Sequence, residues 1–594
     1  MYLKRSIRKK DGVTYESWSL VESVRTQRGP RQRTVAVLGK LPGLDEEARI
    51  GWEHIGRILD GKHNQRDFLK SFRDPPKWAK VDLSRVSIER LRHFGNVYLA
   101  LALWRRLGLH EFFDDVMTQG REEIPWSIIA CILTLARFCA PSSELQISES
   151  WYEKTALDDL WGVCPEKVND DRLYRGLDAL LPYREKLFAH LQKTYGEMFG
   201  ISYDFLLYDV TSTYFEGMAE RNDQAKRGYS RDSRPDCVQI CIGLVVTREG
   251  FPIAYEVFDG NRNDVTTVEE IVSAMEQKYG KAGRVWVMDR GMVSEENLDM
   301  LREIGAKYLV GTPRSMLKKF EEQLIEKDWT EIQPGLEVKA CRCPDGSRET
   351  YILCRSPKRK EKEKAMRERH MKGIEKGLQG LKNSTEKGFL LDRGKAERRI
   401  GRLFQRYSRA ARFFNVTVSE SSWIREDGKR LLVVEWKKRA SRTTWAELSD
   451  GCYLLRTNIK GKKPAELWKI YMGLTKVEDS FRITKQDLGL RPVYHQKQDR
   501  TQSHIMICFL ALSMWRTLEH WMESAGIGTA PRKLLEEMKE VRSVDVVLPT
   551  EAGKNVRLRV VSKPSKRLSI LLKYLDLPLP NKPKRISNVV ATLP

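Results

Sequence analysis

The chain has 594 residues, with 105 Lys and Arg against 81 Asp and Glu, which gives a formal net charge of +24. A chain of this length exceeds what one hydrophobic core organises, so we expect several domains. Its apolar and aromatic content excludes a disordered chain. The charge favours a large polyanion as partner, nucleic acid first, although membrane surfaces attract the same charge.

The longest apolar runs, residues 128–135 and 505–515, are shorter than the roughly 20 residues that span a bilayer. They predict buried helices and no membrane partner. The first residues lack the apolar stretch of a secretory signal, so we expect a cytoplasmic protein. Among ten cysteines, Cys341, Cys343 and Cys354 come nearest to a metal cluster. They lack the second pair or spaced His of a zinc site, which favours reduced structural thiols.

In the N-terminal third, the spacing of apolar residues changes once, from a strand-like to a helical period. Residues 1–45 alternate like short strands around a turn at 28–30, which predicts a β-hairpin region. From 46 to 200 the apolar residues follow a helical period, which predicts a helical domain. Its basic helices serve either DNA contact or solubility, and we expect the former.

Residues 201–312 predict a mixed sheet. Three strand-like segments, 204–213, 236–247 and 251–260, precede an alternation of helix and strand that ends near 312. A three-stranded meander followed by βαβ units is a mixed sheet of the ribonuclease-H type, within a multidomain α/β chain.

Residues 313–450 interrupt this pattern. Strand-like pieces flank a long charged segment with helical spacing, which predicts an insertion domain with a basic helical hairpin. We expect a solvated hairpin; the alternative is a DNA-facing arm, which the excess of basic residues and the interleaved Tyr407, Phe413 and Phe414 support.

The core is expected to resume over residues 451–520, with a strand at 451–459 and a helix from Pro464. Residues 521–594 predict a C-terminal region of helix and short strands. Its Pro- and Lys-rich end, 577–587, predicts a flexible tail.

Two carboxylates stand where apolar strands predict none. Asp209 lies in FLLYDV, and Asp289 ends VWVMD. A buried carboxylate is costly unless a cation or strong donor accompanies it. Either Asp alone is explained by a turn or a cap. The pair favours one shared cation, and Mg²⁺ suits such oxygen ligands.

The helix from Pro464 offers a third carboxylate. Tyr471, Leu474, Glu478 and Lys485 follow one another at intervals of three, four and seven residues, which places them on one helical face. A structural helix would carry apolar residues there, so the mixture favours a functional stripe. Lys485 alone is also explained as a solvated charge.

The spacing of Tyr471, Glu478 and Lys485 resembles the Y-R-E-K signature of DDE transposases from bacterial insertion sequences. Residues 207–217, 259–267 and 287–298 are similar to that group, and 20–39 resembles the start of one of its branches. The resemblance implies a ribonuclease-H-like core, interrupted by an insertion domain before the glutamate helix. Leu474 stands at the family's arginine position and cannot itself make that phosphate contact; the neighbouring Lys476 and Arg482 are the candidates to replace it.

The resemblance also implies a function. Asp209 would bridge two Mg²⁺ ions, or Mn²⁺, with Asp289 and Glu478 each completing one site. Tyr471 and Lys485 would hold the DNA strand. The protein would cut double-stranded DNA at terminal inverted repeats and join the ends to target DNA, with or without a hairpin on the excised end. A homodimer in a synaptic complex, in the nucleoid of a bacterium or archaeon, is the expected setting.

Other functions remain open from sequence. A catalytically inert DNA-binding regulator derived from a transposase is the main alternative, although it has no need of three carboxylates. An RNA-binding or structural protein would leave Asp209 and Asp289 unexplained. A plain ribonuclease or resolvase accounts less well for the insertion.

Overall fold

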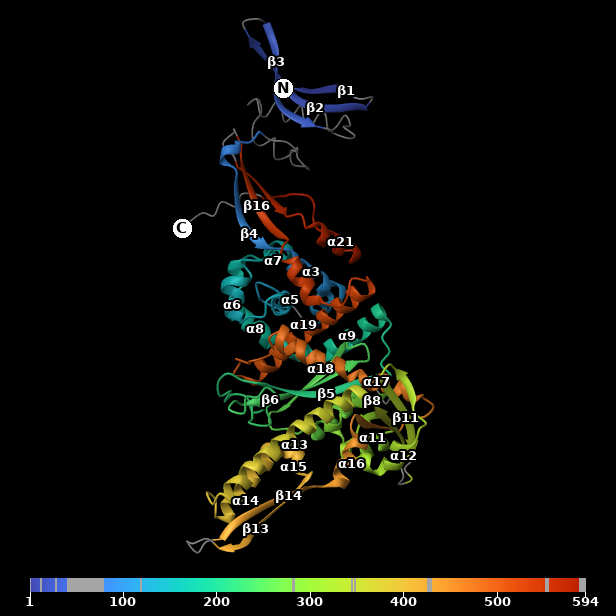
Figure 1. Ribbon diagram of the computed structural model, residues 1–594. Coiled ribbons are helices and arrows are strands. Elements are labelled where there is room, and N and C mark those ends of the chain that lie inside the picture. Colours follow the sequence, from blue (N-terminus) through green and yellow to red (C-terminus); the bar gives the residue numbers. More distant parts are fainter. Residues whose placement is uncertain are drawn as a thin grey trace. The chain divides into compact units, whose positions relative to one another are not determined.

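The computed structural model describes residues 2–10, 13–26, 29–39, 80–117, 120–279, 284–342, 346, 349–424, 430–550 and 555–586. The chain divides into two compact units, and Figure 1 colours both along the sequence. Unit 1 takes residues 1–176 and 517–594, and unit 2 takes residues 177–516.

Unit 1 contains two antiparallel sheets. The first joins β1 (Tyr2–Lys10), β2 (Val13–Thr26) and β3 (Gly29–Gly39), so a third strand precedes the expected hairpin. Residues 40–79 lie outside the described part. The second sheet has the order β18-β17-β16-β4 and consists of β4 (Ser87–His93), β16 (Arg542–Pro549), β17 (Asn555–Val561) and β18 (Lys584–Ile586).

Two predictions about unit 1 are wrong. The segment 87–93 is a strand inside a region expected to be helical, because it pairs with β16 from the other end of the chain. The expected flexible tail contains β18, which pairs with β17. The tail is also held by the Tyr98 hydroxyl, which donates to the carbonyl of Pro578 at 2.9 Å. The contacts of β4 with β16 and of Tyr98 with Pro578 join distant parts of the chain, and a local composition pattern does not reveal them.

Most of the remaining described part of unit 1 is helical. Its helices include α3 (Gly95–Arg106), α4 (Leu109–Val116), α5 (Trp126–Cys139), α6 (Glu144–Gln146), α7 (Leu157–Trp161), α20 (Pro531–Met538) and α21 (Lys566–Tyr574). The apolar run 128–135 forms the buried centre of α5, as predicted. Two helices cross the boundary between the units, α8 (Asp170–Leu180) and α19 (Gln498–Ser524).

Within the described ranges, no single helix is long and apolar enough to cross a membrane. One sharply bent pair, Trp126–Cys139 with Glu144–Trp151, passes the same test of length and composition jointly.

Unit 2 is organised around one nine-stranded mixed sheet with the order β10-β11-β12-β15-β9-β8-β5-β6-β7. The predicted meander is confirmed, since β6 is antiparallel to both β5 and β7. The strands β8 and β9 continue it in parallel with β5. These strands are β5 (Phe205–Tyr214), β6 (Gln239–Thr247), β7 (Pro252–Asp259), β8 (Val285–Met288) and β9 (Lys307–Gly311).

The two faces of β5 meet different helices. Side chains alternate along a strand, so Leu207 and Asp209 share one face and Tyr208 lies on the other. The Tyr208 hydroxyl bonds Thr267, which directly precedes α10 (Val268–Tyr279), at 3.0 Å. On the Asp209 face, Leu207 lies against Gly473 between α17 (Pro464–Met472) and α18 (Leu474–Arg482). Further helices of unit 2 are α9 (Arg184–Phe199), α11 (Glu295–Glu303) and α12 (Glu321–Ile325).

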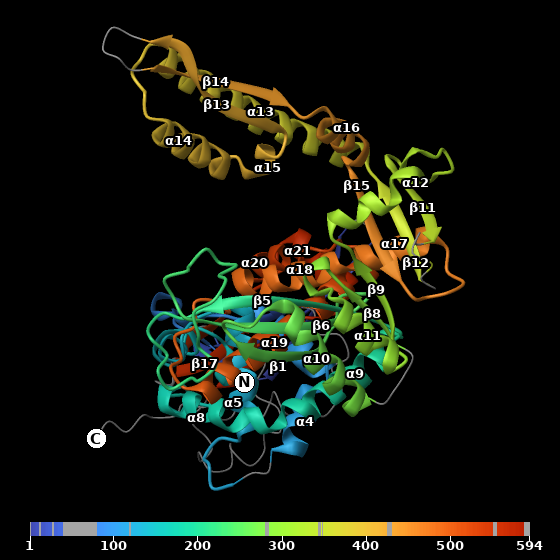
Figure 2. The ribbon, with the colours of Figure 1, turned by 90° about the horizontal axis from the view of Figure 1, so that it is seen from below.

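The segment expected to be an insertion contributes strands to the same sheet. β10 (Thr330–Gln333), β11 (Leu336–Arg342), β12 (Thr350–Arg355) and β15 (Cys452–Thr457) extend it beyond β9. Between β12 and β15, Figure 2 shows an elongated group set off from the sheet. It consists of α13 (Pro357–Glu386), α14 (Arg393–Arg406), α15 (Ser408–Ala411), β13 (Phe414–Ile424), β14 (Arg430–Lys438) and α16 (Ala440–Ser449). We call this group the insertion arm.

The insertion arm has its own small core. The two predicted helices are present, and the β13-β14 ribbon packs with them. Phe413 and Phe414, expected as candidate DNA-facing aromatics, are only 2% exposed and pack with Ile374 and Leu378 of α13. Tyr407 packs partly buried against the same cluster. The aromatic interpretation is therefore wrong for both Phe side chains, because the apolar stripe of α13 requires partners.

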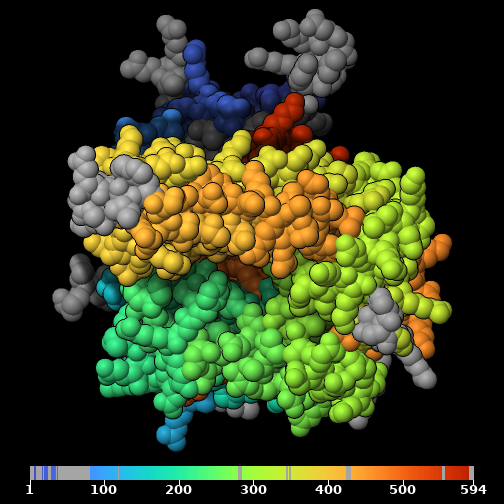
Figure 3. All heavy atoms as spheres, turned by 60° about the horizontal axis from the view of Figure 1, so that its bottom comes forward, coloured from blue at the N-terminus to red at the C-terminus, as the bar shows by residue number. Residues whose placement is uncertain are grey.

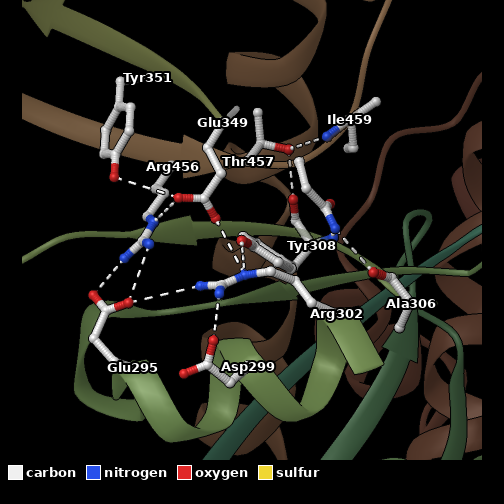
Figure 4. Close-up of polar contacts among 11 residues, drawn as sticks. Glu295, Asp299, Arg302, Ala306, Tyr308, Glu349, Tyr351, Arg456, Thr457 and Ile459 are labelled. Atoms are coloured by element: carbon white, nitrogen blue, oxygen red, sulfur yellow. Dashed lines mark hydrogen bonds and ion pairs between the residues drawn. The ribbon is translucent and has the colours of Figure 1, made fainter. Parts of the chain in front are cut away.

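A polar network ties the strand after the insertion arm to the rest of the sheet (Figure 4). Arg456 of β15 donates to Glu349 and to Glu295 at 2.6 Å each. Arg302 of α11 lies 3.7 Å from both carboxylates. Arg456 and Glu349 are buried, and a buried charge is tolerated only when it is paired in this way. The network fixes where the chain returns to the core before α17.

Candidate active site

The strand register brings the first two predicted carboxylates side by side. In the parallel strands, Tyr208 is the register partner of Met288, which in turn is the partner of Val310. The next residues along the chain are Asp209 in β5, Asp289 directly after β8, and Gly311 at the end of β9, and they continue this row beyond the paired residues. Neighbouring strands lie roughly 4.8 Å apart, so the two carboxylates are close although distant in sequence.

Asp209 is held in an unfavourable environment for an ionised carboxylate. Burial raises its pKa to about 7, and the charges of Asp289 and Asp264 act in the same direction. The N–H of Val210 and the charge of Arg231 oppose this rise. The electrostatics favour either a proton or an added cation at this position.

Tyr471 of α17 orients the second carboxylate. Its hydroxyl donates to Asp289 Oδ1 at 3.1 Å. The same hydroxyl lies over Gly311, where a Cβ would approach the Tyr471 oxygen to 2.4 Å. The absence of a side chain at 311 therefore makes room for the contact between Tyr471 and Asp289. Burial and the neighbouring Asp289 raise the pKa of Tyr471, so it remains a donor.

Glu478 is placed differently. It lies on α18, exposed, one turn after the buried Leu474. Among the described residues it makes no hydrogen bond or ion pair. The same part of the chain contains no group of three or more His, Cys, Asp or Glu side chains that could hold a metal ion. The structure thus pairs Asp209 with Asp289 and does not gather Glu478 into a set of three ligands.

Lys485 is engaged in a buried ion pair. Its Nζ lies 2.9 Å from Asp232 Oδ1, and both side chains are under a tenth exposed. Arg491 pairs with the same carboxylate oxygen. Burial lowers the pKa of Lys485, while Asp232 acts in the opposite direction. This cation is therefore neither a solvated charge nor open to a ligand without displacing Asp232.

The helix that carries these residues is not continuous. It breaks at Gly473 between α17 and α18, and a π-helical turn, Ile483–Asp487, follows α18. The expected single face therefore does not extend to Lys485, because a π turn rotates the residues after it relative to an α-helix.

Three charged residues near the site were not predicted. Asp264 forms an ion pair with Arg231 and adds to the field at Asp209. Asp232 holds Lys485. Asp264 lies within 259–267, a segment that resembles the transposase group, and this resemblance could have predicted it as a site residue. Asp232 lies in a loop without periodicity, far from Lys485 in sequence, so no sequence pattern predicted its contact with Lys485.

The donor chemistry of this row suits a hard divalent cation. Both oxygen ligands come from carboxylates, one of them buried with its pKa raised, and Mg²⁺ prefers such ligands together with water. A cation would relieve the repulsion between Asp209 and Asp289. The residues present therefore fit the metal that the sequence predicts.

Comparison with known families shows the class of protein. A model of the transposase DDE domain family matches residues 202–514, more than half of the chain, and the chain belongs to this family of transposases. The N-terminal domain of IS1634 family transposases matches residues 3–71, so the protein is a DDE transposase of an insertion sequence. A domain of unknown function, DUF4277, matches residues 86–193. No curated protein matches the chain.

Proposed function

We propose that this transposase binds the terminal inverted repeats of its element and catalyses metal-dependent DNA strand cleavage followed by strand transfer. The observation that carries the proposal is the adjacency of Asp209, in β5, and Asp289, directly after the parallel strand β8, in a chain of the DDE family. Metal-dependent phosphodiester chemistry uses carboxylates placed in this way to hold cations beside the scissile phosphate.

The proposed ligands are Asp209, Asp289 and Glu478, for two Mg²⁺ ions or Mn²⁺. Bound metal supplies Lewis acidity toward the phosphate and lowers the pKa of a water or hydroxyl nucleophile. Asp209 suits this role because burial and the charges of Asp289 and Asp264 raise its pKa, so a bound cation would stabilise its ionised form. Asp289 is held in orientation by the Tyr471 hydroxyl. Glu478 contributes from α18, which packs on the Asp209 face of the sheet.

We infer a ribonuclease-H-like core for residues 201–312 and 451–520. The antiparallel meander β5-β6-β7 followed by parallel β8 and β9 supports this inference. The helical N-terminal region is proposed as a DNA-binding domain. A homodimer that holds two DNA ends in the nucleoid completes the proposal.

The DNA contacts of Tyr471 and Lys485 differ in what they require. The Tyr471 hydroxyl already donates to Asp289, so Tyr471 would contact the DNA strand beside this hydrogen bond. Lys485 would have to exchange Asp232 for a phosphate, because its ammonium is buried against that carboxylate. Leu474 offers no phosphate contact, and its side chain is buried.

The test is cleavage of DNA that carries the flanking inverted repeats, with Mg²⁺ and with chelator, by the parent protein and Asp289→Asn. We expect the variant to lose roughly 10³-fold or more of the cleavage rate, since a lost metal ligand removes several kcal/mol of transition-state stabilisation. Asp223→Asn is the matched control, because Asp223 is exposed and makes no ion pair within the described ranges. Equal cutting by parent and Asp289→Asn would refute the mechanism. Binding without cutting by the parent would establish the inert regulator instead.

A further inference from the structure

A large cleft in unit 2 begins at the candidate active site and continues along the insertion arm. Its volume is about 1180 Å³, and its walls include Asp289 and Tyr471. Figure 3 shows the face on which the insertion arm, in yellow and orange, and the green part of the sheet border a furrow. The cleft therefore connects Asp289, one of the proposed catalytic carboxylates, with the arm.

The lining of the cleft is strongly basic. Eight of its described lining residues are Lys or Arg, and three are Asp or Glu. Two of these carboxylates are already paired with arginines of the cleft. Glu363 lies 2.9 Å from Arg314 and 3.0 Å from Arg359, and Asp450 pairs with Arg314 and Arg367. Within the described part, Lys358, Lys362, Arg409 and Arg412 have no carboxylate at ion-pair distance.

One face of α13 supplies much of this charge. Lys358, Arg359, Lys362 and Arg367 all line the cleft, and Lys358 and Lys362 lie one helical turn apart. Farther along the same helix, Ile374 and Leu378 are buried in the core of the insertion arm. The helix is thus anchored by its second half and presents its first half to the cleft.

Arg412 lies among cations rather than beside a carboxylate. Partial burial, followed by the charges of Arg314, Arg442 and Arg367, lowers its pKa, and Asp450 opposes this only in part. Guanidinium groups gathered in this way repel one another unless an anion lies between them. Arginine binds phosphate oxygens through two parallel N–H bonds, which makes phosphate the anion that suits such a cluster.

We propose that this cleft binds the sugar-phosphate backbone of the DNA strand that leads to Asp209 and Asp289, with Arg412 and Lys362 contacting phosphates. This inference rests on the proposed function, since it assigns to the same site the path of its substrate. Phosphate contacts of this kind fix position without reading sequence. The insertion arm is then part of the substrate-binding surface rather than a solvated appendage.

The test uses a fluorescein-labelled duplex of random sequence, without divalent metal, titrated with protein over a series of KCl concentrations. Each phosphate contact that is lost lowers the slope of log affinity against log salt by about one. We expect Arg412→Gln to lower the slope by about one and Arg412→Gln with Lys362→Gln by about two. The single variant should bind roughly tenfold more weakly at low salt, as for the loss of one charged hydrogen bond.

The matched control is Arg402→Gln, because Arg402 is an exposed arginine of α14 that does not line the cleft. The melting temperature of each variant is measured in parallel. Removing Arg412 relieves repulsion, so the variant should melt at or above the parent temperature while binding DNA less well. A merely structural role would lower both. Slopes and affinities equal to those of Arg402→Gln would overturn the proposal.

This outcome is separable from that of the cleavage assay. A parent protein that cuts its inverted repeats, together with unchanged slopes in the cleft variants, would refute the cleft alone. A fall in slope with a parent that cuts nothing would support the cleft and refute the proposed catalysis.

Discussion

The row of carboxylates and the arginine-rich cleft show the same physical effect with opposite sign. Burial and neighbouring carboxylates raise the pKa of Asp209 to about 7, whereas partial burial and neighbouring arginines lower that of Arg412. Each region carries like charges that the protein itself leaves only partly compensated. A divalent cation relieves the first and a phosphate relieves the second. The two regions therefore match the two proposed ligands, a divalent cation at Asp209 and a phosphate at Arg412.

The largest expected effect separates the catalytic region from the DNA-binding cleft, and it concerns Glu478. This residue is the proposed third ligand, which the structure does not group with Asp209 and Asp289. Glu478→Gln should reduce Mg²⁺-dependent cleavage by roughly 10³-fold while leaving binding of the random-sequence duplex unchanged. The fold should be unaffected, because this exposed side chain has no partner among the described residues. Strand cleavage and anisotropy measure the two effects. Glu303→Gln, on an exposed position of α11, is the control. Full activity in Glu478→Gln would exclude it as a ligand.

The acidic side of the comparison can be sharpened by pH. The pKa of Asp209 is about 7 in the folded chain against an ordinary 3.8, so the folded state binds this proton more tightly than the unfolded state. The free energy of unfolding that protonated Asp209 contributes is fully present below pH 3.8, its ordinary pKa, and is lost as the pH rises through about 7. In chelator, Asp209→Asn should therefore be more stable than the parent at pH 8, by at most about 4 kcal/mol, with the difference vanishing near pH 4.

Thermal unfolding at a series of pH values measures this difference. Asp223→Asn should show no such dependence on pH. Added Mg²⁺ should raise the melting temperature of the parent and not that of Asp209→Asn, because only the parent keeps the carboxylate. A parent and an Asp209→Asn variant with parallel stability profiles would show that Asp209 is ionised at little cost.

The sequence predicted the part of the fold that local pattern controls. The strands around Asp209 and Asp289 are continuous apolar runs, so both their existence and their mixed sheet could be inferred. The pairing of β4 with β16 could not, because it joins segments from distant parts of the chain. The pairing of β18 with β17 could not, because the Pro- and Lys-rich composition around β18 predicts no strand. The β13-β14 ribbon was missed since a charged helical pattern dominates its surroundings.

The candidate site divides in the same way. Asp209 and Asp289 could be paired because each is a carboxylate in or at the end of an apolar strand of the same predicted sheet. The buried ion pair of Lys485 could not be predicted, because its partner Asp232 lies in an aperiodic loop. The helical-wheel argument assumed one continuous helix, and Gly473 and the π-helical turn remove that assumption. The Phe413 and Phe414 prediction failed because composition does not distinguish an exposed aromatic from a buried one.

The smallest effect that we expect concerns Gly311 and Tyr471, whose contact positions Asp289. In Gly311→Ala the new methyl would meet the Tyr471 hydroxyl at 2.4 Å, so the ring must move away from Asp289. We expect a loss of about 1–3 kcal/mol in stability, as for overpacking, and a roughly tenfold slower cleavage. Tyr471→Phe should slow cleavage by a similar factor, because it removes the same hydrogen bond.

The double variant decides between a shared and a separate role. If Gly311 acts only by leaving space for the hydroxyl, combining Gly311→Ala with Tyr471→Phe should slow cleavage by little more than either change alone, since the second change removes a contact already lost. Multiplying effects would mean that Gly311 acts on the site by another route, for example through the N–H of Arg290, which lies 3.3 Å from the Cβ position. The coupling energy from this cycle therefore measures how much of the effect of Gly311 on cleavage depends on the hydrogen bond from Tyr471 of α17 to Asp289.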